Sequence, residues 1–326
     1  MKILCADVLK APADIELKIF GEDAEIIIAD AKNNNDISDD IWNSCNAILA
    51  YDQLIYNKAC IDKLHNCKVI VRVGVGYDNV DLKYAKDKGI IVCNVPDYGT
   101  EEVADHTMAL LLNLSRGIKK YTSNVENRNW DRSHDLPVRL RGKTLGIIGL
   151  GRIGTATAMR AKAFGLNIVY FDPYIEDGYD KALGLTRVYS LKDLAKQSKF
   201  ISIHTPINNE TKEILNQEFF NNLNPGTFLV NTARGGLVDI EALKEAMKKN
   251  IISACGLDVL PIEPNDDSQS LIVELEKQED WIKNRLIITP HVAFYSPEAY
   301  VEMRKSAAAE ALRVLEGSIP RNQLNQ

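Results

Sequence analysis

Three glycines in the segment Gly149-Leu150-Gly151-Arg152-Ile153-Gly154 are spaced so that the backbone could approach a phosphate group closely. An apolar run over 145–148 precedes them, and a helix-compatible stretch over 155–164 follows, so the glycines lie where a strand turns into a helix. A helix N-terminus presents unpaired N–H groups and a partial positive charge, which favour an anion. The spacing therefore indicates the pyrophosphate site of a dinucleotide.

An acidic residue, Asp172, ends the next apolar run, which covers 168–171. A carboxylate at the end of this second strand accepts from both ribose hydroxyls and repels a 2′-phosphate. A glycine triplet alone is weak evidence, because ordinary turns show the same spacing. Here strand, glycines, helix, second strand and acid occur in order, so the sequence predicts NAD rather than NADP as the cofactor.

Three charged or titratable side chains follow predicted strands further along the chain. Arg234 lies in the segment 231–236, Glu263 follows the segment 256–259, and His291 follows Thr289 and Pro290. Open parallel sheets place their ligands at the carboxyl ends of the strands. Hydride transfer between a nicotinamide and a carbonyl needs a proton donor, a group that stabilises its charged form, and a cation for a substrate carboxylate.

The residue types match these three roles. Histidine titrates near neutrality, so His291 suits proton transfer, and a nearby Glu263 carboxylate would favour the imidazolium form. The planar fork of Arg234 can bind a carboxylate with two hydrogen bonds, as in a 2-oxo acid. Taken singly, such a histidine is more often structural, and an arginine or glutamate is usually solvated surface. Their joint occurrence at successive strand ends favours a catalytic site.

The bulk composition is that of an ordinary globular protein, with 326 residues, 45% hydrophobic and 26% charged residues, and a net charge of −6. This length suggests about two domains. The absence of a long basic block argues against nucleic acid as the main partner. Apolar runs such as 108–112 are too short to span a bilayer, and no secretory signal is visible, so we expect no membrane association.

The six cysteines include no Cys-x-x-Cys pair, and most lie in or beside apolar runs. Buried thiols in a reducing compartment explain this better than disulfides or a metal site. We therefore expect a cytoplasmic protein with no bound metal. The cysteines occupy positions 5, 45, 60, 67, 93 and 255.

Short β-rich runs alternate with helical segments on both sides of the glycines, which is typical of parallel sheets with helices on both faces. The chain holds about twice as many such runs as one mononucleotide-binding half needs. We therefore predict an α/β fold with two doubly wound parallel-sheet domains. Besides 145–148 and 168–171, the expected strands cover 2–6, 25–29, 47–50, 69–73, 90–93, 200–204, 228–231, 254–258 and 286–289, and helices are expected at 55–64 and 82–88.

The turn-rich stretch 96–100 predicts the first domain boundary. Thr100 is a plausible N-cap for a long helix that reaches Tyr121 with an apolar stripe ending at Ile118. A second boundary is expected after His291. The predicted domains are a substrate domain of residues 1–99 plus 292–326 and an NAD-binding domain of residues 100–291.

Two segments near the C-terminus have clear local signals. Ser296 followed by Pro297 predicts a helix start, and the helix can run to Glu316 before Gly317 stops it. The polar stretch 265–284 is interpreted as an exposed insertion that ends in a short helix.

Over essentially its full length, the chain resembles the D-isomer-specific 2-hydroxyacid dehydrogenase family. The resemblance implies a split, flavodoxin-like substrate domain, a Rossmann-type NAD domain, and a homodimer formed through the helix over 100–121. It rests on the segments 74–81, 149–154, 231–235, 256–259 with Glu263 and Pro264, and 289–291.

Carried over residue by residue, the resemblance implies that Arg234 orients the substrate, His291 is the acid/base, and Glu263 is its partner. The backbone N–H groups of Val75 and Gly76 would meet the substrate carboxylate, although 73–76 alone indicates only a tight turn after a strand. The positions implied to line the NAD site are Thr107, Gly149, Gly151, Arg152, Ile153, Gly154, Asp172, His204, Pro206, Thr232 and Asp258.

Within the family, the stretches 72–79 and 291–296 look most like the C-terminal-binding-protein branch. Arg72 would then be a second substrate-side cation. Phe294 stands where that branch commonly has tryptophan, which implies a pocket of different shape. Two functions follow as hypotheses: an NAD-dependent enzyme interconverting a D-2-hydroxy acid and its 2-oxo acid, or an NAD(H)-sensing scaffold for other proteins with little turnover.

Overall fold

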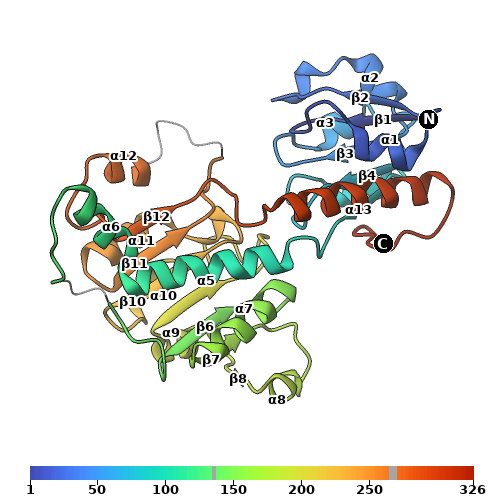
Figure 1. Ribbon diagram of the computed structural model, residues 1–326. Coiled ribbons are helices and arrows are strands. Elements are labelled where there is room, and N and C mark those ends of the chain that lie inside the picture. The colour runs from blue at the N-terminus through green and yellow to red at the C-terminus, as the bar shows by residue number, and fades with distance from the viewer. Residues whose placement is uncertain (134–136, 264–269) are drawn as a thin grey trace. The chain divides into compact units, whose positions relative to one another are not determined.

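The chain divides into two compact units, residues 1–99 with 295–326 and residues 100–294 (Figure 1). A computed structural model describes residues 1–133, 137–263 and 270–326. The second boundary was predicted after His291, whereas in the structure the second unit ends at Phe294. Each unit is built around its own parallel sheet.

In residues 1–99 and 295–326, all of which are described, five parallel strands form a sheet in the order β2-β1-β3-β4-β5. This is the strand order of flavodoxin-like folds. The central strands β3 (Ala47–Ala50) and β4 (Val69–Arg72) are fully buried, as expected where helices cover both faces. The remaining elements are β1 (Lys2–Cys5), β2 (Glu25–Ile28), β5 (Ile91–Asn94), η1 (Asn34–Asp36), α1 (Asp14–Phe20), α2 (Asp39–Ser44), α3 (Lys58–Ile61), α4 (Leu82–Asp87) and α13 (Pro297–Leu315).

The C-terminal segment completes this first unit. Helix α13 packs on α1 and on strands β3 and β4. Its predicted start is confirmed, because the Ser296 hydroxyl accepts from the N–H of Ala299 at 3.0 Å, and Gly317 follows the helix with a left-handed φ of 78°. Residues 322–325 then pair with the outer edge of β5. The last part of the chain is therefore part of the first unit's core.

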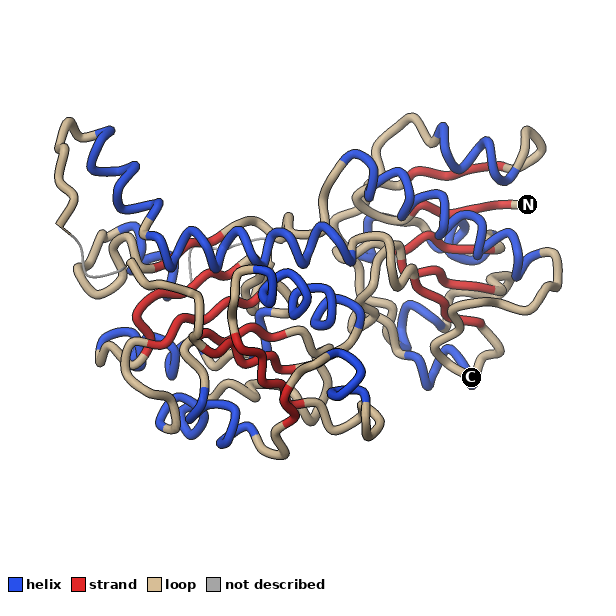
Figure 2. Tube along the Cα trace, turned by 60° about the horizontal axis from the view of Figure 1, so that its bottom comes forward, coloured by secondary structure: helices blue, strands red, loops and turns tan. Residues whose placement is uncertain are grey.

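The described residues of 100–294 form a sheet of seven parallel strands in the order β12-β11-β10-β9-β6-β7-β8. Figure 2 draws the strands of both sheets in red. The direction of winding reverses between β6 and β9, which are neighbours in the sheet. Such a reversal is the topological switch point at which Rossmann-type sheets bind ligands. The strands are β6 (Thr144–Ile148), β7 (Asn167–Phe171), β8 (Thr186–Arg187), β9 (Phe200–Ile203), β10 (Thr227–Asn231), β11 (Ile252–Leu257) and β12 (Leu286–Ile288).

The two sheets confirm the predicted α/β fold with two doubly wound domains. The two-residue strand β8 was not predicted, and α3 is shorter than the helix expected over 55–64. The helices of the second unit are α5 (Thr100–Arg116), α6 (Ile118–Glu126), α7 (Arg152–Ala163), α8 (Tyr179–Leu183), α9 (Leu191–Gln197), α10 (Gln217–Asn221), η2 (Gly235–Leu237), α11 (Ile240–Lys248) and α12 (Ser270–Glu276).

The long helix predicted over 100–121 is in fact two helices. Gly117 adopts a left-handed φ of 67°, which ends α5 at Arg116 before α6 begins. The predicted apolar stripe is wrong at its last member, because Ile118 is 50% exposed. Thr100 is also not a cap, since it is already the first helical residue of α5.

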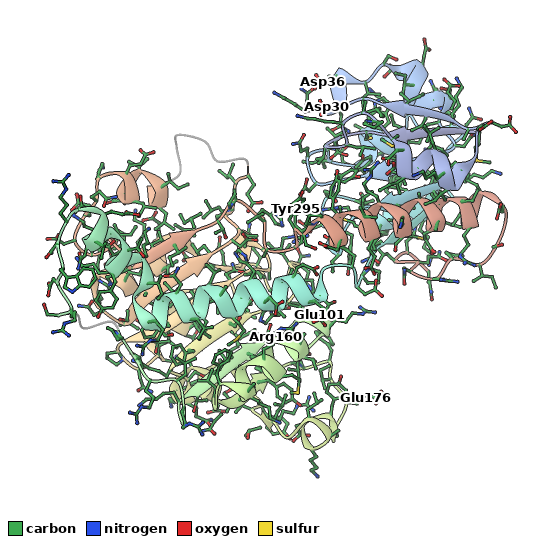
Figure 3. All side chains as sticks on the ribbon, in the orientation of Figure 1. Asp30, Asp36, Glu101, Arg160, Glu176 and Tyr295 are labelled. Atoms are coloured by element: carbon green, nitrogen blue, oxygen red, sulfur yellow. The ribbon has the colours of Figure 1, made fainter. Side chains whose placement is uncertain are left out.

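Helix α5 lies against the second unit's sheet and against α7. Arg160 of α7 contacts the carboxylate of Glu101 on α5 (Figure 3). Its Nε also lies 2.6 Å from Asp105 Oδ1 on the same helix. Both carboxylates are exposed, so these ion pairs contribute little to stability. Other side chains of α5 reach the ends of two strands described below.

The stretch 265–284 differs from the exposed insertion that its polar sequence predicts. Residues 264–269, which include Pro264, lie outside the described residues. The short helix α12 comes at the start of the described part rather than at its end. Leu271 and Ile282 are buried in a core cluster of the second unit, because these apolar side chains remove their surface from water there.

All six cysteines are buried, and none forms a disulfide. Among the described residues, no group of three or more histidine, cysteine, aspartate or glutamate side chains is placed to hold a metal ion. Over the same residues, every helix is too short or too polar to cross a membrane.

Candidate active site

The glycine turn after β6 shows a different requirement at each glycine. Gly149 has a φ of 87°, which strongly favours glycine, and a Cβ at Gly154 would lie 2.1 Å from the carbonyl oxygen of Gly149. Gly151 has a φ of −69°, and a Cβ there would meet no heavy atom within 4 Å. The protein's own packing therefore explains the first and third glycines, whereas the second leaves open space in front of the N-terminus of α7. A pyrophosphate group fits this arrangement.

Asp172 directly follows β7 beside the glycine turn. Its Oδ2 accepts from the N–H of Leu150 at 2.8 Å, and its Oδ1 accepts from the N–H of Tyr174 at 2.9 Å. A carboxylate offers about four lone-pair positions, so two hydroxyl groups could still donate to Asp172. The carboxylate is thus held by the backbone in a position suited to a ribose.

The switch point between β6 and β9 holds the next predicted residues. His204 directly follows β9, and its Nε2 lies 2.8 Å from the Ser202 hydroxyl. Burial lowers the pKa of His204 to about 4, so the ring is neutral at pH 7. Pro206 is exposed at the same strand end. Arg152 and Ile153, in the first turn of α7, are exposed and partly buried respectively.

Thr107 and Thr232 are brought together by α5 and the end of β10. The Thr107 hydroxyl donates to the carbonyl of Val103 at 2.8 Å, and the two threonine hydroxyl oxygens lie 2.8 Å apart. Since the Thr107 proton is used on Val103, the Thr232 hydroxyl donates to Thr107. Both threonines are buried, so they shape this strand end mainly through bonds within the protein.

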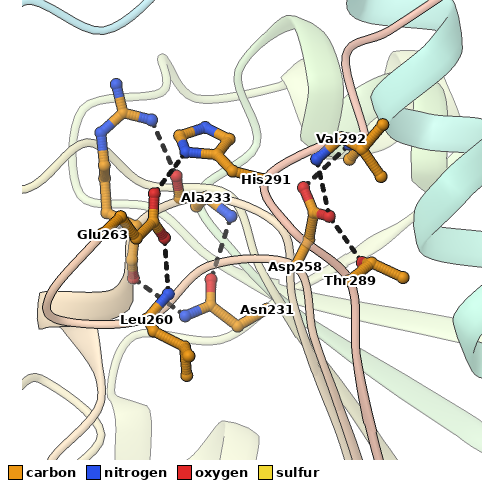
Figure 4. Close-up of polar contacts among 10 residues, drawn as sticks. Asn231, Ala233, Asp258, Leu260, Glu263, Thr289, His291 and Val292 are labelled. Atoms are coloured by element: carbon orange, nitrogen blue, oxygen red, sulfur yellow. Dashed lines mark hydrogen bonds and ion pairs between the residues drawn. The ribbon is translucent and has the colours of Figure 1, made fainter. Parts of the chain in front are cut away.

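His291 and Glu263 form a directly bonded pair (Figure 4). His291 Nδ1 lies 2.6 Å from Glu263 Oε2, and Glu263 Oε1 accepts from the N–H of Leu260, also at 2.6 Å. The second bond fixes the carboxylate, which in turn orients the imidazole. Because Nδ1 is engaged, Nε2 is the ring nitrogen available for proton exchange with a substrate.

The turn that carries His291 is unusual, because His291 itself has a left-handed φ of 52°. Its N–H donates to the carbonyl of Asp258 at 2.8 Å. The Asp258 carboxylate, in a residue that is 1% exposed, accepts from the N–H groups of Val292 at 3.0 Å and Ala293 at 2.9 Å (Figure 4). Asp258, predicted to line the NAD site, therefore also holds this strained turn in place.

Arg234 lies in the turn after β10. The buried Asn231 folds that turn, since its Oδ1 accepts from the N–H of Ala233 at 3.0 Å and its amide donates to the Arg234 carbonyl at 2.9 Å. Arg234 Nη1 donates to the carbonyl of Ala233 at 2.9 Å. A Cβ on Gly235 would lie 1.9 Å from the carbonyl carbon of Leu260, so this glycine lets the Arg234 turn touch the loop that carries Glu263.

The structure thus brings Arg234, Glu263 and His291 to the carboxyl ends of the adjacent strands β10, β11 and β12. Phe294 belongs to the same unit, and its ring lies edge-on to the His291 ring with centroids 6.3 Å apart. A histidine, its carboxylate partner, an arginine and an aromatic ring are therefore contributed by neighbouring loops of the second unit.

The remaining predicted substrate residues belong to the first unit. Arg72 ends β4, is 6% exposed, and donates from Nη1 to the Val73 carbonyl at 2.7 Å. The Asn94 amide donates to the carbonyl of Val75 at 2.7 Å, which fixes the loop that also contains Gly76. These residues therefore lie together at the carboxyl end of β4.

Sequence reasoning missed three contributors. Asn231 lies in the segment 231–236 and Leu260 directly follows the segment 256–259, but nothing in their spacing indicated that they hold the Arg234 turn and the Glu263 carboxylate. His106 of α5 was also missed, although its Nε2 lies 3.0 Å from the Thr289 hydroxyl. The only local signal was its position next to Thr107, which by itself does not identify a partner so far along the chain.

The chain is similar to known proteins over most or all of its length. The sequence profile described as "D-isomer specific 2-hydroxyacid dehydrogenase, NAD binding domain" matches residues 108–293, more than half of the chain. The chain is 35% identical over 325 residues to the D-3-phosphoglycerate dehydrogenase of Methanocaldococcus jannaschii, covering 100% of this chain and 59% of that protein. It is 32% identical over 318 residues to C-terminal-binding protein 1 of Caenorhabditis elegans, covering 94% of this chain and 42% of that protein. The chain thus spans about half the length of these curated relatives.

Solved structures show the same fold. The D-lactate dehydrogenase of Aquifex aeolicus, complexed with NAD and lactic acid, matches with a TM-score of 0.88 at 28% identity, over 99% of each chain. An NADPH-dependent glyoxylate/hydroxypyruvate reductase of Sinorhizobium meliloti, in complex with NADP and malonate, matches with a TM-score of 0.85 at 28% identity, over 99% of this chain and 96% of that one. The match to the family's NAD-binding domain makes NAD the cofactor of the second unit. The chain belongs to the D-isomer-specific 2-hydroxyacid dehydrogenase family.

Proposed function

We propose that this protein is an NAD-dependent enzyme that interconverts a D-2-hydroxy acid and its 2-oxo acid, with His291 as the acid/base. The observation that carries the proposal is the 2.6 Å contact between His291 Nδ1 and Glu263 Oε2 at the carboxyl edge of a Rossmann-type sheet. A histidine that is oriented by a carboxylate and keeps one nitrogen available is equipped to move a proton at a substrate oxygen.

In the direction of reduction, NADH when bound supplies a hydride to the carbonyl carbon of the 2-oxo acid. The protonated His291 gives its Nε2 proton to the carbonyl oxygen as the carbon–oxygen double bond becomes single. Glu263 stabilises the imidazolium before transfer and keeps the ring in position afterwards. The products are the 2-hydroxy acid, NAD⁺ and neutral His291, and oxidation follows the same steps in reverse.

We assign substrate binding to Arg234 and to the first unit's Arg72, Val75 and Gly76. Arg234 has the charge and the planar fork that a carboxylate requires. In the first unit, the backbone N–H groups of Val75 and Gly76 are proposed to bind the substrate carboxylate, with Arg72 as a second cation. Phe294, beside the His291 ring, is proposed to line the space for the substrate's side chain.

The test is NADH consumption with a panel of 2-oxo acids, using the wild type and the His291→Asn variant. At least one acid should support turnover by the wild type, and His291→Asn should lower kcat by at least about 100-fold, the scale of general acid–base catalysis. A matched control is His65→Asn, which changes an exposed histidine of the first unit. The proposal fails if no 2-oxo acid is reduced, or if His291→Asn is as fast as His65→Asn.

A second candidate function is an NAD(H)-sensing scaffold that binds other proteins and turns over little substrate. The observation that favours it is the 32% identity with a C-terminal-binding protein over 94% of this chain. This function requires association that depends on the cofactor. Sizing the protein with a candidate protein partner, with and without NADH, separates the two functions, because an enzyme of the first kind needs no such NADH-dependent complex.

We also propose that the protein is a cytoplasmic homodimer. The six buried thiols without disulfides support a reducing compartment. The exposed apolar side chains of Ile118, Val125 and Trp130, on and after α6, support a contact between copies near the end of α5. Light scattering of the wild type and a Val125→Glu variant tests the dimer: the wild type should have twice the monomer mass, and the variant a lower one.

A further inference from the structure

A chain of side chains connects α5 to the turn that carries His291. His106 Nε2 lies 3.0 Å from the Thr289 hydroxyl oxygen, and that oxygen lies 2.5 Å from Asp258 Oδ1. His106 Nε2 and Asp258 Oδ1 are themselves 3.7 Å apart. The His106 side chain is 24% exposed, whereas that of Asp258 is 0% exposed. A partly exposed ring on a helix is thus linked through one hydroxyl to a fully buried carboxylate.

The direction of each hydrogen bond in this chain follows from its partners. Asp258 Oδ1 accepts from the N–H of Val292 and Oδ2 accepts from the N–H of Ala293, and backbone N–H groups can only donate. The carboxylate therefore acts as an acceptor on both oxygens. The Thr289 hydroxyl, with its single proton, must donate to Oδ1 at 2.5 Å. It follows that Thr289 accepts at its other side, and that His106 Nε2 carries a hydrogen and donates it.

Asp258 in turn holds the His291 turn at both of its ends. The Asp258 carbonyl accepts from the N–H of His291, and the carboxylate accepts from the next two N–H groups along the chain. His291 has a φ of 52° and keeps this unfavourable conformation only because its surroundings enforce it. Any change in where the Asp258 carboxylate points will be passed to the His291 ring.

We propose that His106 is a positioning residue for the reaction. By donating a hydrogen bond to the Thr289 hydroxyl, His106 keeps that hydroxyl's proton directed at the Asp258 carboxylate, and so holds the His291 turn in its reactive conformation. This inference rests on the proposed role of His291 as acid/base. His106 itself acts through Thr289 and Asp258. It adds to the Glu263 contact, which orients the same ring from its Nδ1 side.

The first test measures the tautomer of His106 directly and needs no substrate. In ¹⁵N-labelled protein, long-range ¹H–¹⁵N spectra distinguish the protonated and unprotonated ring nitrogens of the five histidines, and the His106→Gln variant assigns the His106 signals. We expect a proton on His106 Nε2. A ring protonated on Nδ1 alone would overturn the proposal, whatever activity the enzyme has.

The second test compares three substitutions at the same site. His106→Gln keeps an N–H donor near the position of Nε2, His106→Asn places its amide nearer to the position of Nδ1, and His106→Leu has no donor. We expect Leu and Asn to lower kcat for 2-oxo acid reduction about tenfold, as for one lost hydrogen bond with a misplaced turn. Gln should restore kcat to within about threefold of the wild type. The KM of the 2-oxo acid and the Kd of NADH should change less than about twofold, because the substitutions act on the turn rather than on binding.

The control is Asp105→Asn, which alters the preceding residue of α5 and its ion pair with Arg160 on the protein surface. Asp105→Asn should have the wild-type kcat. The proposal is overturned if His106→Leu also has the wild-type kcat, if His106→Gln is as slow as His106→Leu, or if the loss occurs only in KM or Kd.

A final measurement keeps this inference separate from the proposed function. The ring ¹³C–¹H signal of His291 should shift in His106→Leu and return toward its wild-type position in His106→Gln. If the wild type reduces no 2-oxo acid, the proposed function fails, while the His291 signal and the His106 tautomer still decide the positioning role. An unchanged His291 signal in His106→Leu would refute it. Should His106→Leu not fold, Thr289→Val and Thr289→Ser provide the same comparison, since only serine keeps the hydroxyl.

Discussion

The Gly151→Ala substitution is expected to weaken NADH binding while leaving the fold intact. Gly151 has a φ of −69°, which alanine adopts readily, and an added Cβ would meet no heavy atom of the protein within 4 Å. The matched substitution Gly154→Ala should behave in the opposite way, because its Cβ would lie 2.1 Å from the carbonyl oxygen of Gly149. The two glycines belong to one turn, so the pair separates the room needed by the cofactor from the room needed by the protein.

The expected magnitudes follow from these contacts. Gly151→Ala lowers the entropy of the unfolded chain, which stabilises the folded protein by about 0.4–1 kcal/mol. Alanine is a poorer N-cap residue than glycine, which costs about the same. The free energy of unfolding should therefore stay within about 1 kcal/mol of the wild type. A methyl group that pushes the pyrophosphate away from one N–H donor should cost about 1.5–3 kcal/mol of binding, or roughly 10- to 100-fold in Kd. Gly154→Ala must move backbone atoms and should lose about 3 kcal/mol of stability.

Urea unfolding followed by circular dichroism gives the stabilities, and NADH fluorescence titration gives the Kd of each variant. Two results would contradict these expectations: Gly151→Ala binds NADH within twofold of the wild type, or Gly151→Ala is destabilised as much as Gly154→Ala. The first result would mean that the space beside Gly151 does not receive the cofactor. The second would mean that the protein itself needs this glycine.

Three further predictions concern charge. Because the pKa of His204 is lowered to about 4, the unfolded chain binds a proton more readily than the folded protein between about pH 6.5 and pH 4. The free energy of unfolding of the wild type should therefore fall as the pH falls through this range. Urea unfolding should show that His204→Asn loses about 2 kcal/mol less of this free energy than the wild type between pH 7 and pH 4.5. Arg304 lies 2.6 Å from the buried carboxylate of Glu16, so Arg304→Met should cost about 3–5 kcal/mol in urea unfolding, and the double variant with Glu16→Gln should cost less, because no buried charge is left unpaired. Asp172→Ala removes the carboxylate that repels a 2′-phosphate and should raise the ratio of kcat/KM with NADPH to that with NADH at least about tenfold, whereas an unchanged ratio would show that another group selects the cofactor.

Much of the fold could be predicted from local sequence. The strand β3 was predicted with the bounds that the structure shows, and the other long strands were predicted to within a few residues, because a buried parallel strand is a short apolar run between polar helices. The start of α13 was predicted for the same kind of reason, since an N-cap serine followed by proline acts within one turn. Two predictions failed for reasons that lie outside local sequence. The left-handed φ of Gly117 divides the helix predicted over 100–121, and tertiary packing buries apolar side chains in the described part of 265–284.

The sequence by itself determined the cofactor turn and the types of the reacting groups. A left-handed φ at Gly149 and a close approach at Gly154 are requirements that neighbouring residues impose on one another, so they are visible in the spacing of the glycines. Tertiary structure decided which groups meet. His291 and Glu263 are 28 residues apart and are bonded at 2.6 Å, and His106 reaches Thr289 across 183 residues. Their meeting depends on the order of β10, β11 and β12 in the sheet and on where α5 packs, and no local pattern of residues specifies either.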